Sequence, residues 1–552
     1  MVDEKSKEKA REIVSLRDRE KAKQDTFRSL WQSVSDLMFP QTFGISHKLS
    51  AGTELMNHLF DTTAVEEIEN MTSGLVNNLF PAGQQFFAII PSAAKENYTV
   101  KRYVAMLAEE THQAIFNSNF VAQISNTIQY WITFGTGCFY SEFGARGLNF
   151  RDYAIGTYQC LEDSGGVIDT VILTCPMTAR QIVQKFGGGK SDESLVGRSV
   201  SQAFSKPESR EETFDVIQVV RPREDYDTNA YLRPQNRMPI ESTYVLERDQ
   251  IVLHEGGYDE FPFAVPRYQV IYRETYGRGR GTMLLPQVRV LNRLAKDYLD
   301  MSNKWVNPPK EVLESFEGQV DVTPGALNYV PEIPTVKAMD MGAHGVFPTT
   351  KDILEYYRDG VRQSLFKNAF EALANLRGDR RTTLEISERL KEGMRKLSKP
   401  LGRLFNELVT QSVLRSALLL IRNGAVAQPP TILQGTPLKI ELINPLALAL
   451  RDQQSRGFQY WVGIGQQMEQ SFPGVTDNVA ADEAFRDLGQ ALGVKTTHIR
   501  PVPERDAIRE ERRKATQAQE QAQLAQAAAN VYNQGTKAPE EGSPAEALTG
   551  AA

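Results

Sequence analysis

Apolar residues recur every three or four positions in the middle of the chain, a spacing that places them on one face of an α-helix. Thr282 is positioned to cap this helix, and Pro286 then lies in the first turn, where its missing N–H costs little. Asn307 precedes Pro308 and is pushed out of the α region, so the helix should end near that residue. The pattern predicts a rigid helical strut. Its apolar face consists of Leu284, Val288, Leu291, Leu294, Tyr298 and Met301.

A short β-rich segment follows the double proline Pro308-Pro309. Residues 311–318 (EVLESFEG) and 325–330 (GALNYV) can pair as strands, and the sequence between them supplies turn residues. Helical periodicity resumes at Thr350, so two helices bracket a compact β insert and must run antiparallel. The apolar face of the second helix consists of Ile353, Leu354, Tyr357, Val361 and Leu365.

A longer helical run is predicted over 384–422, after a loop at 374–383 that reads ANLRGDRRTT. About forty residues at about 1.5 Å each would span roughly 55–60 Å. Pro400 lies inside this run and removes a backbone hydrogen bond, which predicts a kink in the helix. Asn423 and Gly424 are suited to end it.

The residues before the strut alternate between helical and strand patterns, which predicts an α+β body. Asp61 is positioned as the N-cap of a helix that stops before Pro81. Other helices are predicted at 3–39, 98–117, 121–134 and, for PMTARQIVQKF, 176–186.

Short alternating segments between Cys138 and Leu173 are typical of an antiparallel meander. Polar residues dominate 189–210, which predicts a mobile loop, and a second exposed excursion is predicted at 231–238. Further strands are predicted at 214–225, 242–256 and 263–274.

The C-terminal fifth of the chain begins with a predicted strand and turn at 439–447 and a helix through Phe458, Trp461 and Met468. Residues 503–532 are rich in Ala, Gln, Glu and Arg and carry only a weak apolar stripe. A helix of this composition cannot build a core alone and needs identical neighbours. The composition of 533–552 predicts disorder.

Length and composition indicate a soluble protein of several domains. A chain of 552 residues exceeds what one compact core supports, so about two to four domains are expected. Apolar content of 41% and charged content of 24% are ordinary for a globular protein. No window approaches about eighteen consecutive apolar residues, and the charged N-terminus lacks the apolar core of a signal peptide. We therefore expect no membrane segment and synthesis in the cytoplasm.

The sequence offers no motif for catalysis, and we expect neither a metal nor a cofactor. The run Gly187–Ser191 (GGGKS) fails as a phosphate-binding loop because Gln184 stands where glycine is needed and a helix precedes it. The run Gly277–Gly281 (GRGRG) is interpreted as a cramped turn that enters the strut. The six histidines are scattered, and the three cysteines lack paired spacing. We interpret Cys138, Cys160 and Cys175 as buried small hydrophobes.

Several blocks, in the same order, resemble the portal (head-to-tail connector) proteins of short-tailed, T7-like bacteriophages, the podoviruses. The resemblance covers roughly 27–502, and the set of blocks carries it rather than any single motif. The blocks are FDTTAVEEIENMTSGLVNNLFPAGQQFFAI (60–89), SNFVAQISNTIQYWITFGTGCFYSE (118–142), GGVIDTVILTCPMTARQIVQKFG (165–187), FPFAVPRYQV (261–270), the strut with its β insert (274–330) and NPLALA (444–449).

The resemblance implies a mostly α-helical α+β fold with wing, stem, clip and crown, assembled as a homo-oligomeric ring, usually a dodecamer. No enzymatic activity is implied. The implied domains are a wing or body at 1–275, a first stem helix at 276–307, a clip at 308–348, a second stem helix at 349–373, a tunnel loop at 374–383, a long kinked helix at 384–424, the C-terminal part of the wing at 425–502, a crown helix at 503–532 and a disordered tail at 533–552.

The resemblance also suggests which residues meet DNA. Arg377, Arg380 and Arg381 lie in the implied tunnel loop, where arginine can contact phosphates without reading sequence. The corner between stem and clip is marked by Trp305, Asn307, Pro308 and Pro309. The strut carries weaker candidates for contact with DNA in the channel, namely Arg289, Arg293, Lys296 and Lys304, and Lys310 follows the strut. The sequence does not define which side of the strut faces the lumen.

The implied role is a passive channel at a unique capsid vertex, part of the virion and assembled in the host cytoplasm. The net charge of −6 is compatible with a wall along which DNA slides, because each phosphate neutralised by Lys or Arg adds affinity. The implied partners are other copies of the chain, double-stranded DNA, the terminase motor, tail adaptor and tail tube proteins, major capsid and scaffolding proteins, and internal core proteins. Two alternatives stay open: a non-annular virion scaffold or adaptor, and a DNA-packaging nuclease-ATPase.

Overall fold

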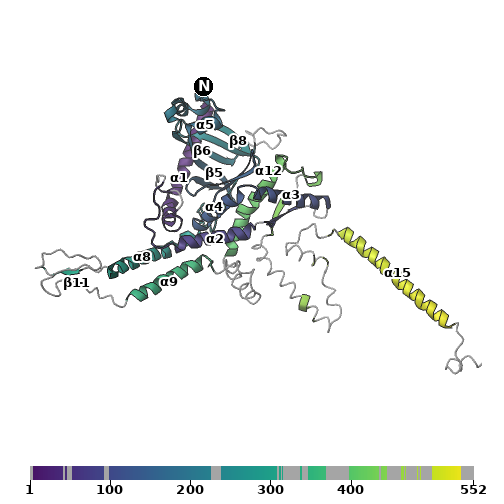
Figure 1. The fold of residues 1–552 in the computed structure, drawn as a ribbon. Coiled ribbons are helices and arrows are strands. Elements are labelled where there is room, and N and C mark those ends of the chain that lie inside the picture. The colour runs from purple at the N-terminus through teal and green to yellow at the C-terminus, as the bar shows by residue number, and fades with distance from the viewer. Residues whose placement is uncertain are drawn as a thin grey trace, which may run out of the picture. The chain divides into compact units, whose positions relative to one another are not determined.

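The computed structural model describes the following residues: 4–40, 44–46, 52–81, 83–91, 98–224, 238–306, 310–312, 314, 336–338, 346–367, 397–433, 437–443, 462–464, 467, 482, 485, 500 and 502–535. They divide into two compact units. The first unit consists of Met1–Ala94 and Met106–Leu450, and the second of Lys95–Ala105 and Arg451–Ala552. The first unit is a mixed α+β body with a projecting pair of helices (Figure 1).

The body is built on a five-stranded antiparallel sheet in which the strands neighbour one another in chain order. Val171 pairs with Val220 and Val216 with Leu246, so the middle strand pairs with the strands before and after it in the chain. The short antiparallel strands predicted at 138–173 and the strand predicted at 214–225 are therefore confirmed, although the former divide between two sheets, and the segment 242–256 forms two strands instead of one. The strands are β4 (Tyr158–Glu162), β5 (Ile168–Thr178), β6 (Thr213–Pro222), β7 (Ile240–Leu246) and β8 (Ile251–Tyr258).

The helix predicted at 3–39 is confirmed as α1 (Glu4–Met38), and it covers one face of this sheet (Figure 1). Its Ala10 and Ile13 pack against Ile217 and Val219 of β6. Successive side chains of a strand point to opposite faces of the sheet. Val216 therefore lies on the other face, where it joins a second apolar cluster. The alternation along β6 thus buries both faces of the sheet.

The second face is covered by a segment that was expected to be a mobile loop, and that expectation is wrong. Residues 189–210 form α6 (Glu193–Val196), α7 (Arg198–Ser205) and the 3₁₀ turn η1 (Pro207–Ser209). Three small apolar residues are enough to fix the segment, because they pack into the core beside α5 (Ala179–Phe186). These residues are Val196, Val200 and Ala203.

Helix α5 begins later than predicted. Pro176 and Met177 continue β5, and Thr178 caps the helix in a reciprocal capping box with Gln181. The glycines that follow α5 lead into α6 through a turn. The element directly before GGGKS is therefore a helix and not the strand that a phosphate-binding loop requires, as predicted.

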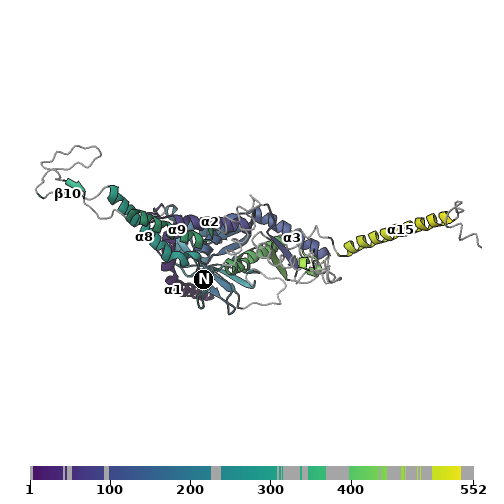
Figure 2. The ribbon, with the colours of Figure 1, turned by 90° about the horizontal axis from the view of Figure 1, so that it is seen from below.

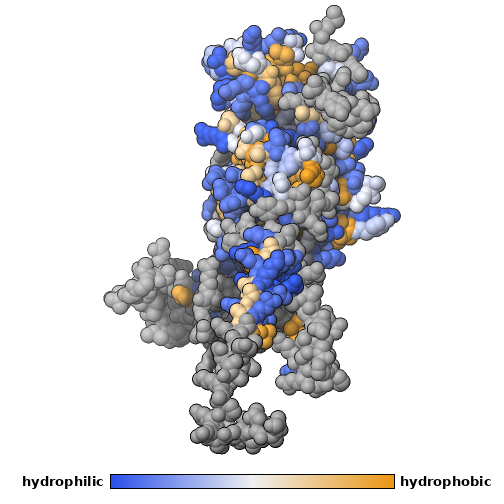
Figure 3. Space-filling view, turned by 90° about the vertical axis from the view of Figure 1, so that its right-hand side faces the viewer, coloured by the Kyte–Doolittle hydropathy of each residue, from blue (hydrophilic) through white to orange (hydrophobic). Residues whose placement is uncertain are grey.

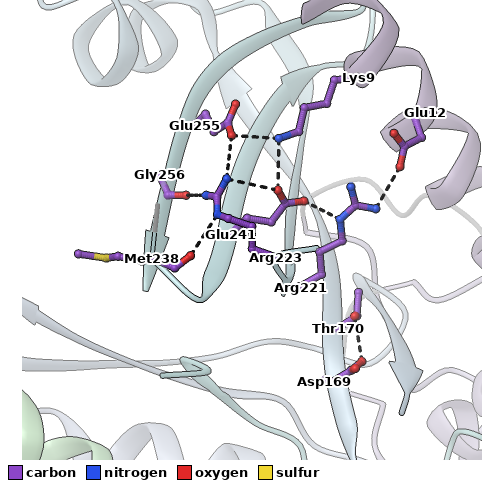
Figure 4. A network of polar contacts seen from close by, with 10 residues as sticks. All are labelled: Lys9, Glu12, Asp169, Thr170, Arg221, Arg223, Met238, Glu241, Glu255 and Gly256. Carbon is purple, nitrogen blue, oxygen red and sulfur yellow. Dashed lines mark hydrogen bonds and ion pairs between the residues drawn. The ribbon is translucent and has the colours of Figure 1, made fainter. Parts of the chain in front are cut away.

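Charged side chains bind α1 to the edge of the five-stranded sheet (Figure 4). Glu241 is 5% exposed and accepts bonds from Lys9 at 3.2 Å and Arg221 at 2.5 Å. Lys9 and Arg223 also reach Glu255, at 3.0 and 3.3 Å. The two carboxylates therefore share cations that come from both the helix and the sheet.

Replacing Glu255 with glutamine is expected to reduce the loss of stability in acid. Burial alone would raise the pKa of Glu255, but the bonds from Lys9 and Arg223 outweigh it and lower the pKa below 4.5. A carboxylate with a lowered folded-state pKa stabilises the fold above its unfolded pKa, and this contribution is lost as the pH falls through the folded value. Urea unfolding at about pH 7 and about pH 3.5 should show a smaller difference for Glu255→Gln than for the parent. Glu208→Gln, at an exposed position, should leave the difference unchanged, and equal differences for both variants would contradict the prediction.

The remaining helices and strands of the body surround an aromatic core. Phe80, at the end of α2, makes edge-to-face contacts with Phe86 at 5.0 Å and Phe120 at 5.2 Å, and Phe120 contacts Phe150 at 5.1 Å. The elements are α2 (Thr63–Leu79), α3 (Tyr98–Phe116, shared between the units), α4 (Phe120–Thr133), and two small antiparallel sheets, β1 (Phe87–Pro91) with β12 (Leu438–Leu442) and β3 (Gly147–Asp152) with β2 (Phe139–Gly144) and β9 (Phe263–Ala264).

Two details of these strands differ from the sequence pattern. β1 was not predicted, and it pairs with the predicted strand β12 from the far end of the unit. The strand predicted at 263–274 is reduced to the two residues of β9, because Val265 to Tyr276 form the turn that leads into the strut.

The long helix is described from Leu397, so most of the residues before the predicted kink lie outside the described part. Pro400 stands in the first described turn, and the kink stays a prediction. The described irregularity is a π-helical segment, η3 (Phe405–Thr410), which continues into α12 (Gln411–Arg422). Gly424 at φ +70 ends the helix, as predicted, with Ala425 N–H donating to Leu420 O at 3.0 Å.

Among the described helices, Leu397–Arg422 is the one long and apolar enough to cross a membrane by length and composition. Half of that window is buried inside the protein. The helix also carries the buried Arg415, which donates to the carbonyl oxygens of Ser141 and Glu260 at 3.0 Å each. These contacts identify it as a core helix of the body.

The second unit is described mainly through the helix α15 (Val502–Gly535), which confirms the helix predicted at 503–532. Arg505 and Arg509 both pair with Asp482, the former at 3.0 Å. Leu524 is 69% exposed, in keeping with a helix whose weak apolar stripe has little to cover it. On the face shown in Figure 3, hydrophobic residues form small groups among hydrophilic ones on the described surface.

Candidate functional site, a projecting helical pair

A crossing of two glycine-rich backbones anchors the root of the strut. A β-carbon on Gly279 would lie 2.5 Å from Ile132 O and 2.6 Å from Gly135 N, and Gly135 itself has φ +98. Tyr268 N–H donates to Gly135 O at 2.8 Å, and Gly277 N–H donates to Thr136 Oγ1 at 2.8 Å. No side chain fits between these segments, so the interpretation of GRGRG as a cramped turn is confirmed.

The strut is α8 (Arg280–Val306), and it begins two residues before the predicted cap. Thr282 therefore lies inside the helix, and Pro286 falls in the second turn instead of the first. The glycine crossing sets the start, because it delivers the chain directly to Arg280, which donates to Tyr268 OH at 3.1 Å and stacks over Phe366 at 4.6 Å. The predicted apolar face is largely confirmed, with its first half buried in the body: Leu284, Leu285, Val288, Leu291 and Ala295.

Helix α9 (Val346–Ser364) runs beside α8 to form a projecting pair (Figures 1 and 2). Gln287 donates to Tyr357 O at 3.3 Å, and Gly360 lets its side chain approach, since a β-carbon there would lie 2.3 Å from Gln287 Nε2. The antiparallel arrangement of two bracketing helices is therefore confirmed. Helix α9 starts before the predicted Thr350.

Ion pairs fasten α9 to α2 at the root of the pair. Arg358 reaches Asp61 at 2.8 Å, and the Asp61 side chain is 2% exposed. Lys367 lies 3.5 Å and Arg362 3.9 Å from the nearly buried Glu67. The second Asp61 oxygen accepts from Thr63 N–H at 3.0 Å, although the N-cap position belongs to Thr62 and not, as predicted, to Asp61.

Replacing Arg358 with methionine is expected to lower the free energy of unfolding by about 2 kcal/mol, because it leaves the buried Asp61 carboxylate without its ion-pair partner. The matched control is Arg293→Met, which removes an exposed pair with Asp297 and should cost less than about 0.5 kcal/mol. Urea unfolding measures both. Equal, small losses would show that the Asp61 contact does not fasten α9.

A two-stranded hairpin lies at the far end of the pair (Figure 2). β10 (Lys310–Val312) pairs antiparallel with β11 (Val336–Ala338), with Glu311 opposite Lys337. β10 includes the first two residues of the strand predicted at 311–318, and β11 was not predicted. Most of the rest of that strand and its predicted partner, 325–330, lie outside the described residues. The backbone of Trp305 belongs to the last turn of α8, whereas Asn307, Pro308 and Pro309 also lie outside.

The outer side of α8 carries a charged arc, which we define as Arg289, Arg293, Lys296, Asp297, Asp300 and Lys304. All six residues are exposed. Arg293 pairs with Asp297 at 3.1 Å, and Lys296 lies 5.5 Å from the ring centre of Phe60. The structure thus brings the four basic candidates of the strut to one face, while Arg377, Arg380 and Arg381 lie outside the described residues.

The part of the chain that the structure describes holds no cluster of His, Cys, Asp and Glu that could bind a metal ion. Cys138 and Cys160 are buried and Cys175 is partly buried, all three as free thiols. Burial raises the pKa of each thiol, so these cysteines are poor nucleophiles. The interpretation as buried small hydrophobes is confirmed for Cys138 and Cys160, whereas Cys175 is only partly buried.

Two anchoring features of the pair escaped sequence reasoning. Gly135 directly follows the helix predicted at 121–134, and nothing in the sequence pairs it with the glycines of 277–281. The contact between Asp61 and Arg358 joins residues 297 positions apart. A carboxylate at a helix start and an arginine on a helix are both ordinary exposed features, so no signal identifies them as partners.

The described residues of the first unit thus form a folded body from which a firmly anchored pair of helices projects. Residues 10–499 match the family described as bacteriophage head to tail connecting protein. The portal protein of Salmonella phage epsilon15 is 26% identical over 521 residues, which cover 92% of each chain. The probable portal protein of Bordetella phage BPP-1 is 23% identical over 519 residues, which cover 91% of each chain.

The chain belongs to the bacteriophage head to tail connecting protein family. This confirms the resemblance drawn from the ordered sequence blocks, including the podoviral relatives. The family is one of structural connectors of the virion, so the expectation that the chain is not an enzyme is confirmed as well.

Proposed function

We propose that this chain is a portal protein whose copies form a ring, with a central channel, at one vertex of the capsid. Double-stranded DNA enters the shell through this channel during packaging and leaves through it during ejection. The observation that carries the proposal is the family match over nearly the whole chain, in which the anchored α8–α9 pair provides an elongated arm.

In the proposed ring, α8 and α9 form the stem, and the hairpin β10–β11 belongs to the clip at its tip. Residues 1–275 and 425–502 form the wing, and α15 forms the crown. The rigid anchoring of the stem by the glycine crossing and by Arg358 supports this division, because a channel wall must keep its position under load. A single helix such as α15, with little apolar surface of its own, gains its packing from identical neighbours.

The proposed channel contacts DNA through phosphates and without reading bases. The four cations of the charged arc and the arginines of the loop at 374–383 supply point or bidentate contacts. Two carboxylates within the arc, together with a net charge of −6, keep the attraction weak enough for DNA to slide.

The proposed partners follow from the position at the vertex. The clip meets the terminase motor during filling and tail adaptor and tail tube proteins afterwards. The wing meets the major capsid and scaffolding proteins, and the crown faces internal core proteins.

The vertex position can be tested in particles of the phage that encodes this chain. A C-terminal tag, decorated with a gold-labelled antibody on opened shells, should mark one vertex per particle. A label on many vertices, or on the shell faces, would contradict the proposal. Shells assembled without the chain should contain no DNA.

A further inference from the structure

The stem carries two exposed apolar patches on opposite sides of α8. Patch A consists of Val290, Ile353 and Tyr356, with exposed fractions of 41%, 43% and 75%. Patch B consists of Leu299 and Val306, with exposed fractions of 48% and 83%. Leu299 follows Val290 by nine residues (299 − 290), which at roughly 100° per residue places it on the opposite side of the helix, roughly 180° away.

Patch B continues a stripe that the body buries. Val288, Leu291 and Ala295 are at most 4% exposed where α8 crosses the body, and Leu299 and Val306 extend the same face toward the tip. Nothing in the described part of the chain covers this extension. An apolar face that is buried along half of a helix and uncovered along the other half indicates a second surface that packs there.

Patch A lies on both helices, along the side of the stem that faces away from the body. Arg358 and Arg362 of α9 reach toward α2, and Tyr356 lies roughly 120–160° from them around the helix. Asn292 of α8 bonds His58 O and the Phe60 N–H, and Val290 lies roughly 160° from it. The two helices therefore present their apolar residues to the same side.

The rims of the two patches carry one pair of opposite charges that can meet. The exposed carboxylate of Asp352 borders Ile353 on patch A, whereas the exposed ammonium of Lys296 lies one turn before Leu299 on patch B. Two different patches on opposite sides, with opposite rim charges, fit a head-to-tail contact between identical copies, in which each copy uses one patch toward each neighbour. A single partner with a different sequence would need only one of the two patches.

We propose that patch A of one copy packs against patch B of the next, so that the stems close into a ring through this heterologous contact. The inference rests on the proposed function and adds which faces of the stem meet the neighbours. The charged arc of α8 lies between the two patches; its Lys296 borders patch B, and its other five residues contact neither neighbour.

Two adjacent residues of α8 provide a matched test. Leu299→Lys places a charge in the contact and should reduce the yield of rings at least about tenfold, because an unpaired cation would be buried there. Asp300→Lys introduces the same side chain on the charged arc, roughly 100° away, and should leave the ring yield unchanged. Ring yield is counted by negative-stain imaging. Thermal unfolding of the unassembled chain should be similar for both variants, since both positions are exposed.

A charge pair tests whether the two patches meet. Ile353→Asp alone should also reduce ring yield, and the double variant with Leu299→Lys should recover it, because every contact then joins an aspartate to a lysine. Intact rings for Leu299→Lys, equal losses for Leu299→Lys and Asp300→Lys, or no recovery in the double variant would overturn the inference while the ring itself stands. Absence of rings from the parent chain would instead overturn the proposed function.

Discussion

Replacing Gly279 with alanine is expected to lower the free energy of unfolding by about 3–5 kcal/mol, the largest effect of any single substitution considered for this chain. The added β-carbon would lie 2.5 Å from Ile132 O, 2.6 Å from Gly135 N and 2.8 Å from Thr133 O. All three are backbone atoms, so no side chain can rotate away to make room. Either the α4 end or the start of α8 must shift, and the strut would lose its anchor.

The control for Gly279 is Gly402, in the long helix. A β-carbon at Gly402 would meet no atom within 4 Å, so alanine there should be neutral or stabilise the chain by up to about 1 kcal/mol. Urea unfolding, followed by circular dichroism, compares the two variants. A Gly279→Ala variant as stable as the parent would show that the glycine crossing is not a close contact in solution.

Replacing Arg377, Arg380 and Arg381 together with alanine is expected to leave ring assembly intact and to reduce packaged or retained DNA by about tenfold or more. The reason is the loss of three phosphate contacts for each copy, repeated around the proposed channel. Quantifying DNA per shell after nuclease treatment measures both defects, since unretained DNA is digested.

The matched control removes the same number of positive charges from the surface of the body. Arg180, Arg210 and Arg248 are exposed there, far along the chain from the loop. Their triple alanine variant should package and retain DNA normally. Normal packaging and retention in the loop variant would remove the tunnel-loop assignment.

Periodicity allowed the helices and the central sheet to be predicted from the sequence. The strut, its antiparallel partner, α1 and α15 each repeat apolar residues at helical spacing, and β6 is apolar at most of its central positions, so both of its faces are buried. Such local patterns survive in the fold because each element buries the face that its own sequence defines.

Features that depend on distant contacts could not be predicted. Residues 189–210 looked polar, yet Val196, Val200 and Ala203 suffice to fix them once the sheet offers a place to pack. β1 exists because β12, 351 positions later at Ile440 opposite Ile89, completes its hydrogen bonds. Propensity alone carries no information about such partners.

The stem shows the same division between local and distant information. Its helices and their antiparallel direction follow from the apolar pattern and the double proline. In contrast, the glycine crossing that anchors α8 and the ion pair of Arg358 with Asp61 join residues that are far apart in the sequence. Patch B was also hidden in the sequence, because burial by the body splits one continuous stripe of α8 into a covered and an uncovered half.

Negative-stain imaging of the purified chain tests the central claim most directly. We expect annular particles with a central hole, built from identical copies arranged head to tail. A compact single copy under all conditions, with no annulus even when the capsid proteins are present, would contradict it.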